Sequence, residues 1–293
     1  MPNPTTPHSG FSGLWLPLIT PFDEGTPDLP ALNRLVKRYA RAGVTGFVVC
    51  GSTGEAAALD DREQLDVLKT VLAACDGLPV VMGASGCHLV QTLAWVKTLS
   101  ECPLAGLLVP APCYIRPSQA GLLHWFGAIA DASRSPLIVY DIPYRTGATI
   151  ELKTLIELSG HPNIQAIKDC SGNPAKTQAL IAHGALSVLA GEDAQIFTTM
   201  ALGGAGAIAA SAHLYTQSFA DVIFHLAKGE LATARRAWAP LPAVIAAMMA
   251  EPNPASIKAA LARHGWIKNE LRAPMTVATL PVSAVLSDLR AVQ

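Results

Sequence analysis

Charge is scarce in this chain and is not concentrated anywhere. Of its 293 residues, 15% are charged, and the formal net charge is −1. No cluster of lysine and arginine occurs along the sequence. Nucleic acids and anionic membrane surfaces attract proteins through such clusters, so neither is expected as a partner. An anionic substrate must then be bound by one or two individually placed cations.

Motifs for disulfide frameworks, metal sites and leader peptides are also missing. The six cysteines form no CxxC pair, and the histidines show no HxH or HExxH spacing. Reduced thiols in a cytoplasmic protein are therefore expected, with no metal site. Residues 1–10 lack a basic segment followed by an apolar run, which is typical of a loose arm and not of a signal peptide. Residues 194–220 lack charged side chains, but their glycines and polar residues indicate buried barrel interior and not a membrane span.

Short apolar runs alternate with amphipathic segments along the chain, and 51% of the residues are hydrophobic. The runs are continuously apolar, as in parallel strands that are covered on both faces. They predict strands over residues 14–18, 46–49, 80–83, 106–109, 137–140, 165–168, 187–190 and 207–209. The amphipathic segments predict helices over residues 29–42, 61–74, 89–100, 119–132 and 150–159. Four helix-capping residues are predicted for these segments: Asp28, Asp60, Ser118 and Thr149.

Eight alternating βα units predict an α/β fold of the (β/α)₈ TIM-barrel type over residues 11–219. The alternative, an open doubly wound sheet, would bring a dinucleotide-binding fingerprint after its first strand, and none is present. The turn Gly51–Gly54 is too short for a Walker loop and has no lysine. Beyond the barrel, residues 217–228, 231–247 and 255–263 predict helices separated by prolines. They indicate a small helical C-terminal domain over residues 220–293.

Lys168 stands out among the candidate functional residues. In a barrel, active residues lie at the carboxyl ends of strands, and Lys168 ends the apolar strand 165–168. Desolvation there would lower its pKa and leave a neutral amine that can attack a ketone. The alternative is a lysine whose stem is buried while its amine reaches the rim of the barrel. Tyr140, at the end of the neighbouring strand, favours the nucleophile because it supplies a candidate acid or base.

Other strand ends leave two interpretations open. Tyr140 is either an acid/base or a packed aromatic residue, and Arg145 is either a carboxylate clamp or a surface charge. Tyr114, between prolines, is either a placed phenol or a packing residue. The turn Gly51–Glu55 is either a nest of amides for a small carboxylate, shaped by its glycines, or an ordinary capped turn.

Together these segments resemble the dihydrodipicolinate synthase / N-acetylneuraminate lyase family of Schiff-base barrel aldolases. The likeness covers nearly the whole chain. Its motifs, in order, are Gly51-Ser52-Thr53-Gly54-Glu55, Tyr114 with Arg116-Pro117, Tyr140-Asp141-Ile142-Pro143, Arg145-Thr146-Gly147, Ile167-Lys168-Asp169, Ala190-Gly191-Glu192-Asp193 and Glu251-Pro252-Asn253-Pro254. Each motif is modest alone, but their shared order supports membership.

The resemblance implies a set of catalytic residues. Lys168 matches the lysine that forms the Schiff base with pyruvate, so no cofactor is expected. Tyr140 matches the residue that moves protons at the imine. Ser52 and Tyr114 match a hydroxyl relay, in which Tyr114 would come from a neighbouring subunit. The protein is accordingly expected to be a homodimer or homotetramer.

The resemblance also implies substrate-binding residues. Thr53 would hold the pyruvate carboxylate, and the backbone of Ile208 would lie beside the bound keto acid. Gly191 would be a further substrate-binding residue. Arg145 matches the arginine with which synthases of the family bind the carboxylate of their aldehyde substrate. The partners implied are small molecules, namely pyruvate and an aldehyde such as aspartate semialdehyde.

Few residues separate the subfamilies. Arg145-Thr146-Gly147 favours the synthase reaction, a condensation of pyruvate with aspartate semialdehyde in lysine and diaminopimelate biosynthesis. Ser52 points toward the lyases, where serine is common at this position. Four residues depart from the family pattern: Cys113, Ile115, Tyr144 and Cys170. They leave open a different activity, namely an aldolase, lyase or dehydratase for N-acetylneuraminate, a 2-keto-3-deoxy sugar acid or another 2-keto acid. A barrel without turnover, acting in ligand binding or assembly, is the third alternative.

Overall fold

The computed structural model describes residues 10–280. Within them, eight parallel strands close into a barrel in the order β1-β10-β9-β8-β7-β6-β5-β4. The strands are β1 (Gly13–Pro17), β4 (Gly46–Val49), β5 (Val80–Gly83), β6 (Gly106–Pro110), β7 (Leu137–Asp141), β8 (Ile164–Asp169), β9 (Ser187–Ala190) and β10 (Gly206–Ile208). The predicted barrel is confirmed, and its strands differ from the prediction only at their ends. An antiparallel hairpin of β2 (Phe22–Asp23) and β3 (Thr26–Pro27), which was not predicted, follows β1.

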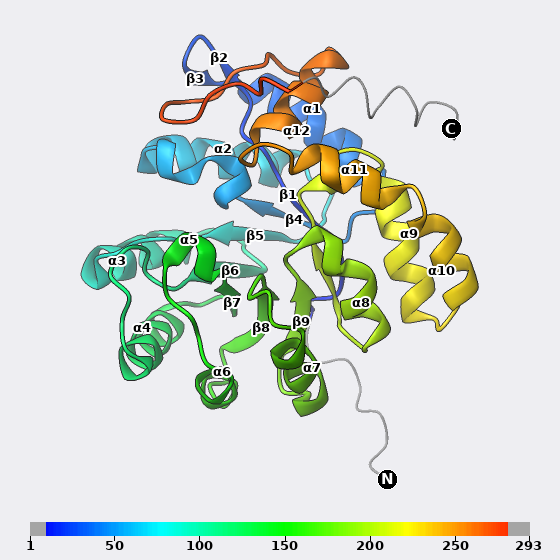
Figure 1. Cartoon of the computed structure of the whole chain (residues 1–293). Coiled ribbons are helices and arrows are strands. Elements are labelled where there is room, and N and C mark those ends of the chain that lie inside the picture. The colour runs from blue at the N-terminus through cyan, green and yellow to red at the C-terminus, as the bar shows by residue number, and fades with distance from the viewer. Residues whose placement is uncertain (1–9, 281–293) are drawn as a thin grey trace. The chain divides into compact units, whose positions relative to one another are not determined.

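Helices follow the strands along the chain. They are α1 (Leu29–Ala40), α2 (Asp61–Ala74), α3 (Leu89–Leu99), α4 (Gln119–Ala132), α5 (Pro143–Thr146), α6 (Leu152–Leu158), α7 (Pro174–His183) and α8 (Ile196–Ala201). Single 3₁₀ turns are η1 (Ser52–Gly54), η2 (Ala56–Ala58), η3 (Asp193–Gln195) and η4 (Ser211–His213). Figure 1 shows α4, α6 and α7 on the outer side of strands β6–β9. Buried strands covered in this way explain the continuously apolar runs.

Three of the four predicted caps are present. The side chains of Asp28, Asp60 and Ser118 accept hydrogen bonds from the first turns of α1, α2 and α4. The prediction for Thr149 is wrong, because α6 begins after Glu151 with no side-chain cap of its own. Gln119 of α4 serves instead: its Oε1 accepts from Glu151 N at 3.1 Å, and its Nε2 donates to Thr149 O at 2.9 Å.

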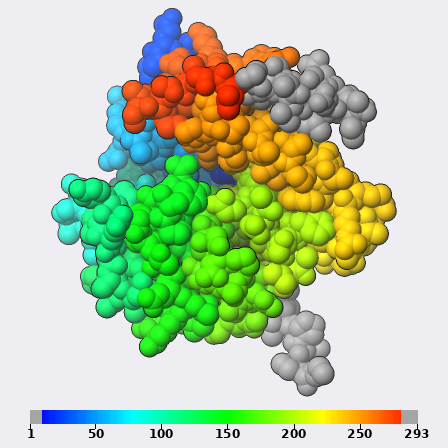
Figure 2. Space-filling model, viewed as in Figure 1, coloured from blue at the N-terminus to red at the C-terminus, as the bar shows by residue number. Residues whose placement is uncertain are grey.

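The remaining helices are α9 (Thr216–Ala227), α10 (Leu231–Trp238), α11 (Leu241–Met248) and α12 (Ala255–Arg263). The segment predicted over 231–247 is therefore two helices. It divides at Pro240, since Pro240 and Pro242 have no N–H groups to continue the hydrogen-bond ladder. In Figure 2, α9, α10 and α11 appear in yellow to orange and form one continuous area of the surface.

The chain divides into two compact units by its internal contacts. In the described residues, the first contains residues 10–13 and 81–208, and the second contains residues 14–80 and 209–280. The predicted boundary between residues 219 and 220 stays a prediction. Of the predicted arm, residues 1–9 lie outside the described residues, as do residues 281–293 of the predicted C-terminal domain.

Candidate active site

Lys168 and Tyr140 lie together in the first unit. Each is the last residue but one of its strand, β8 or β7, and the two are register partners. Lys168 Nζ is 4.3 Å from the centroid of the Tyr140 ring. Both side chains are buried, with 5% and 6% of their surface exposed. A buried amine therefore lies against a phenol ring at adjacent strand ends.

The surroundings of Lys168 favour its neutral form. Burial lowers the pKa of the Lys168 amine below its ordinary value, because the charged form loses its hydration. The nearby carboxylates of Asp193 and Glu192 act in the opposite direction, whereas the positive charge of Arg145 lowers the pKa further. A neutral amine is the nucleophilic form of a lysine. The structure thus supplies the desolvation that the sequence predicted.

Gly191 is a glycine because the backbone after β9 approaches the lysine stem closely. A Cβ atom at this position would lie 2.8 Å from Lys168 Cγ and 2.3 Å from Cys170 Sγ. Gly191 N also donates to Asp169 O at 2.9 Å. No larger side chain fits without displacing Lys168 or Cys170.

Cys170 is a site neighbour to which the sequence gave no role. It is buried two residues after Lys168, and burial raises the pKa of its thiol, so the thiol stays protonated. The side chains of Glu192 and Tyr140 near the thiol also act on its pKa, Glu192 raising it and Tyr140 lowering it. In the sequence, only its position directly after the motif Ile167-Lys168-Asp169 indicated that it could lie near Lys168.

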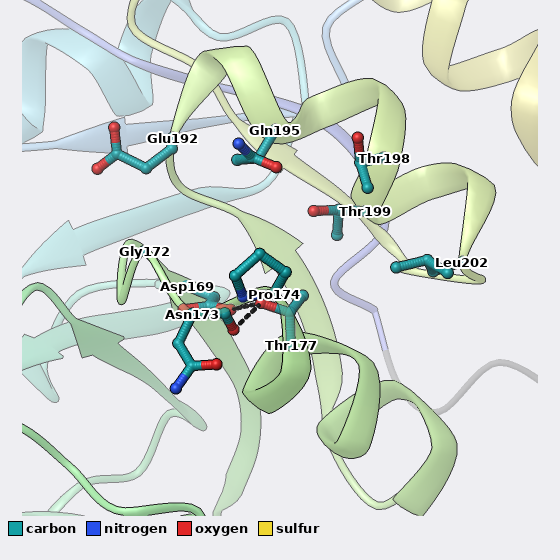
Figure 3. Close-up of a pocket in the computed structure, with 10 residues that line it drawn as sticks. All are labelled: Asp169, Gly172, Asn173, Pro174, Thr177, Glu192, Gln195, Thr198, Thr199 and Leu202. Atoms are coloured by element: carbon teal, nitrogen blue, oxygen red, sulfur yellow. Dashed lines mark hydrogen bonds between the residues drawn. The ribbon is translucent and has the colours of Figure 1, made fainter.

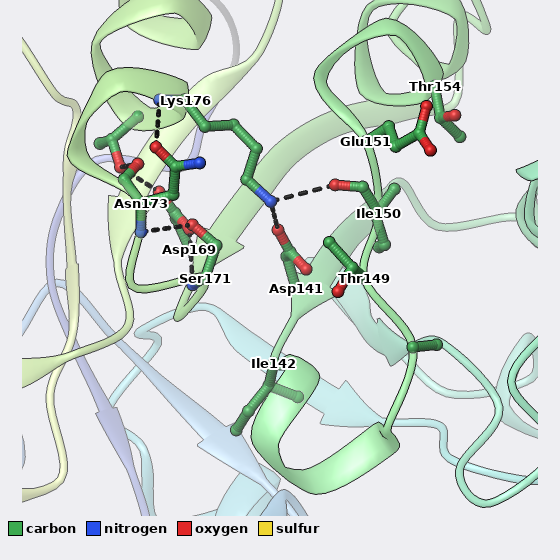
Figure 4. A network of polar contacts seen from close by, with 12 residues as sticks. Asp141, Ile142, Thr149, Ile150, Glu151, Thr154, Asp169, Ser171, Asn173 and Lys176 are labelled. Carbon is green, nitrogen blue, oxygen red and sulfur yellow. Dashed lines mark hydrogen bonds and ion pairs between the residues drawn. The ribbon is translucent and has the colours of Figure 1, made fainter.

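A buried ion pair fixes the end of β7. Lys176 of α7 donates from Nζ to Asp141 Oδ2 at 2.5 Å and to Ile150 O at 3.0 Å (Figure 4). Burial raises the pKa of Asp141, whereas Lys176 acts to lower it. Since Asp141 follows Tyr140 directly, this pair holds the backbone that carries the phenol.

Arg145 lies on α5, the single turn that follows β7. Its side chain is exposed and forms no ion pair with any described residue. The turn ends at Gly147, whose φ of +72° suits a glycine, and Thr146 Oγ1 donates to Ile142 O at 3.1 Å. Since its charge lowers the pKa of Lys168, Arg145 is a cation that is available to an anionic substrate near the amine.

Tyr114 is not brought into contact with Lys168 or Tyr140 within the chain. It lies in the loop after β6, with 94% of its surface exposed and a φ of +72°. Its backbone N donates to Thr146 O at 3.1 Å, so its loop is attached to the turn that carries Arg145. An exposed, anchored phenol leaves the predicted role in a neighbouring subunit as a proposal.

The turn Gly51–Glu55 belongs to the second unit. Thr53 is 2% exposed, and its Oγ1 accepts from Asn253 Nδ2 at 2.9 Å. The explanation by glycine flexibility is wrong, because the left-handed residues are Cys50 and Glu55, with φ of 51° and 53°. Gly51 has a φ of −82°, and Gly54 is small because a Cβ would lie 3.0 Å from Leu18 O.

The amides of this turn are partly occupied. Those of Gly54, Glu55 and Ala56 donate within the turn to Gly51 O and Ser52 O. The amides of Ser52 and Thr53, at the start of η1, have no acceptor among the described residues. Two N–H groups therefore remain for an anion, together with the hydroxyls of the same residues.

Ile208 ends β10 and is fully buried. The next amide, that of Ala209, donates to Trp15 O at 3.1 Å. The predicted contact of the Ile208 backbone with a keto acid stays a proposal.

A separate small pocket in the first unit does not suit a carboxylate substrate. Figure 3 shows it beside α7 and α8, where Asp169 is already bound by Ser171 N at 2.9 Å and Thr177 Oγ1 at 2.5 Å. Its lining contains two acidic residues, Asp169 and Glu192, and no lysine or arginine. The other lining residues are Gly172, Asn173, Pro174, Thr177, Gln195, Thr198, Thr199 and Leu202. An anion would be repelled there.

Comparison with known proteins decides the family. The model of the dihydrodipicolinate synthetase family matches residues 10–288. The chain belongs to this family. The 4-hydroxy-tetrahydrodipicolinate synthase 2 of Clostridium acetobutylicum is 36% identical over 282 residues, which cover 95% of this chain and 97% of the relative.

Solved dihydrodipicolinate synthases share the fold. The enzyme from Aquifex aeolicus superposes with a TM-score of 0.92 at 28% identity, over 96% of this chain and 98% of that chain. A monomeric dihydrodipicolinate synthase variant gives a TM-score of 0.91 at 28% identity, over 96% of each chain. The predicted family and TIM-barrel fold are confirmed, as is the prediction of an enzyme, a lyase of the class I aldolase type.

Two further properties concern only the part of the chain that the structure describes. No helix there is long and apolar enough to cross a membrane. No group of three or more histidine, cysteine, aspartate or glutamate side chains there could hold a metal ion.

A network around Glu55 in this dihydrodipicolinate synthetase family member was not predicted from the sequence. Lys258 of α12 forms a buried ion pair with Glu55, and Arg272 N donates to Glu55 Oε2 at 3.2 Å. The Arg272 guanidinium binds both carboxylate oxygens of Glu63, at 2.5 and 2.6 Å. The only signal was the motif Glu251–Pro254, which was recognised without a role for its Asn253.

Proposed function

We propose that the protein is a 4-hydroxy-tetrahydrodipicolinate synthase, which condenses pyruvate with aspartate semialdehyde in lysine and diaminopimelate biosynthesis. The observation that carries this proposal is the buried Lys168 amine, whose pKa is lowered, beside the Tyr140 ring. The names of the relatives support it, and the exposed Arg145 supplies the cation that a second carboxylate requires.

The proposed chemistry begins with the neutral Lys168 amine. It attacks C2 of pyruvate, and loss of water gives a protonated imine. Loss of a C3 proton gives an enamine, which forms a carbon–carbon bond to the aldehyde carbon of the second substrate while the aldehyde oxygen takes up a proton and becomes a hydroxyl. Attack of the amine of aspartate semialdehyde on the imine carbon then closes the ring and releases the Lys168 amine. Tyr140 is the proposed proton carrier at the imine nitrogen and the carbinol oxygen. The imine nitrogen accepts the electron pair, so the chemistry needs no cofactor.

The family motif suggests roles for the remaining residues. Thr53 is proposed to bind the pyruvate carboxylate through its amide and hydroxyl, and the backbone of Ile208 is proposed to lie beside the keto acid, with Gly191 as a further substrate-binding residue. The Ser52 hydroxyl is proposed to take part in the hydroxyl relay. Tyr114 is proposed to complete the hydroxyl relay from a second copy of the chain. This role requires a homodimer or homotetramer, and the exposure of Tyr114 in the single chain supports it.

The reaction is tested by steady-state assays of pyruvate with a panel of aldehydes. We expect aspartate semialdehyde to give the highest kcat/KM. The exposed Tyr144, which departs from the family pattern beside Arg145, is the feature that favours another aldehyde. Preferred turnover of a sugar-derived or other uncharged aldehyde would replace the synthase by a related 2-keto acid aldolase. Absence of turnover with every aldehyde would favour a non-catalytic barrel.

Replacing Arg145 with alanine should impair use of the aldehyde far more than formation of the pyruvate imine. A guanidinium–carboxylate contact contributes about 1.5–3 kcal/mol, so kcat/KM for aspartate semialdehyde should fall about tenfold or more. Imine formation is measured in parallel by borohydride trapping. Arg134→Ala is the control, because Arg134 is an exposed arginine that pairs with Glu101. An equal loss of trapping in Arg145→Ala would assign Arg145 to the structure or to the keto acid site.

A further inference from the structure

We propose that Asn253 is a positioning residue that sets the direction in which the Thr53 hydroxyl donates its proton. The inference rests on the proposed function, in which Thr53 binds the pyruvate carboxylate. Asn253 lies between α11 and α12, and its Nδ2 donates to Thr53 Oγ1 at 2.9 Å across a separation of 200 residues. Both residues belong to the second unit.

The chemistry of a hydroxyl gives this contact its meaning. A threonine hydroxyl has one proton to donate and can accept at its lone pairs, whereas a carboxylate can only accept. An N–H from Asn253 uses an acceptor position of Thr53 and leaves its proton for an anion. With the opposite polarity, the amide oxygen of Asn253 would accept the hydrogen bond from the Thr53 hydroxyl. Thr53 would then turn a lone pair toward the carboxylate.

The segment that carries Asn253 is itself held in place. Glu251 accepts hydrogen bonds from the amides of Thr279 and Leu280, both in the last described residues, at 2.8 and 2.7 Å. Lys258, five residues beyond Asn253, pairs with Glu55 at the end of the Thr53 turn. The segment from Asn253 to Lys258 therefore contacts the turn at two residues, Thr53 and Glu55, and Asn253 is the residue that contacts the Thr53 hydroxyl.

The other side of the turn is held independently of Asn253. Thr20 Oγ1 donates to Gly54 O at 2.7 Å, which fixes the backbone next to Thr53. Asn253 Oδ1 is buried without a hydrogen-bond partner among the described residues. The hydrogen bond that the side-chain amide of Asn253 forms with the described residues is therefore the one from Nδ2 to Thr53 Oγ1. Removing this amide should then change the hydroxyl more than it changes the backbone of the turn.

Asn253→Asp provides the first test. It keeps the size of the side chain, reverses its polarity and adds a negative charge that also repels pyruvate. An ionised aspartate can only accept hydrogen bonds, so the Thr53 hydroxyl should donate to it and no longer to the pyruvate carboxylate. The KM for pyruvate should rise about tenfold or more, with a smaller change in kcat. Asn253→Ala leaves the proton on Thr53 and should raise this KM less. A KM for pyruvate in Asn253→Asp equal to that of the wild type would overturn the inference.

A double-mutant cycle then tests whether Asn253 acts through the hydroxyl. In the Thr53→Val background, Asn253→Ala should cause no further rise in the KM for pyruvate. Effects that multiply instead would also overturn the inference. Asn163→Ala is the matched control: its amide donates to Ala130 O and Ser133 O, both at 2.9 Å, and its loss should lower Tm without changing KM.

The outcome separates this inference from the function on which it rests. A wild-type protein that forms no imine with pyruvate contradicts the proposed function. A wild-type protein that forms the imine, with Asn253 variants that keep its KM for pyruvate, contradicts the role of Asn253 alone.

Discussion

Replacing Lys168 with methionine will lower kcat by at least about a thousandfold while the protein stays folded. Methionine keeps the buried stem but has no amine to attack the keto acid. In the wild type, imine formation should slow as the pH falls through the lowered pKa of Lys168, because the amine becomes protonated. The measurement is steady-state turnover of pyruvate and aspartate semialdehyde, with Tm recorded for each variant.

The control for this experiment is Lys153→Met, at an exposed lysine on α6, which should keep wild-type turnover. Substantial turnover in Lys168→Met would show that the nucleophile lies elsewhere, whatever the pKa of Lys168.

Replacing Lys258 with methionine should strongly destabilise the protein. The variant leaves Glu55 buried without its partner, which typically costs about 3–5 kcal/mol. Domains of this kind are stable by about 5–15 kcal/mol, so Tm should fall by roughly 10 °C. Thermal unfolding followed by circular dichroism measures this directly.

Two further variants separate the buried charge from the lost contact. Adding Glu55→Gln to Lys258→Met removes the uncompensated charge and should recover part of the lost Tm. Lys268→Met breaks the exposed pair with Asp23 and should leave Tm unchanged. If Lys258→Met unfolds at the wild-type temperature, the ion pair does not stabilise the turn.

The barrel could be predicted because each strand carries its signal locally. A strand that is buried on both faces must be apolar throughout, and a lysine that ends such a run, as Lys168 does, is conspicuous. Tyr140 was predictable for the same reason, since parallel strands place their carboxyl ends at one edge. Their burial and contact in the structure agree with that expectation.

Features that depend on distant contacts could not be predicted in this way. Gln119 caps α6 from another helix, so the local pattern pointed to Thr149 instead. The left-handed residues of the Thr53 turn are Cys50 and Glu55, where no glycine marks them. Glu55 is held there by Lys258, from far along the chain. Hydrophobic periodicity reports which face is buried, but it does not report such partners.

The site shows the same division. Desolvation of Lys168 follows from its place in an apolar strand, whereas its proximity to the Cys170 thiol and the Glu192 carboxylate follows from packing. Asn253 illustrates the limit most clearly, because its motif was visible and its contact with Thr53 was not.

The most direct test of the central claim is to trap pyruvate on the wild-type protein with borohydride and to locate the adduct by peptide mass spectrometry. The claim predicts one reduced pyruvate per chain, on the peptide that contains Lys168, and no adduct in Lys168→Met. An adduct on a different lysine, or none on a protein that turns over pyruvate, would contradict it.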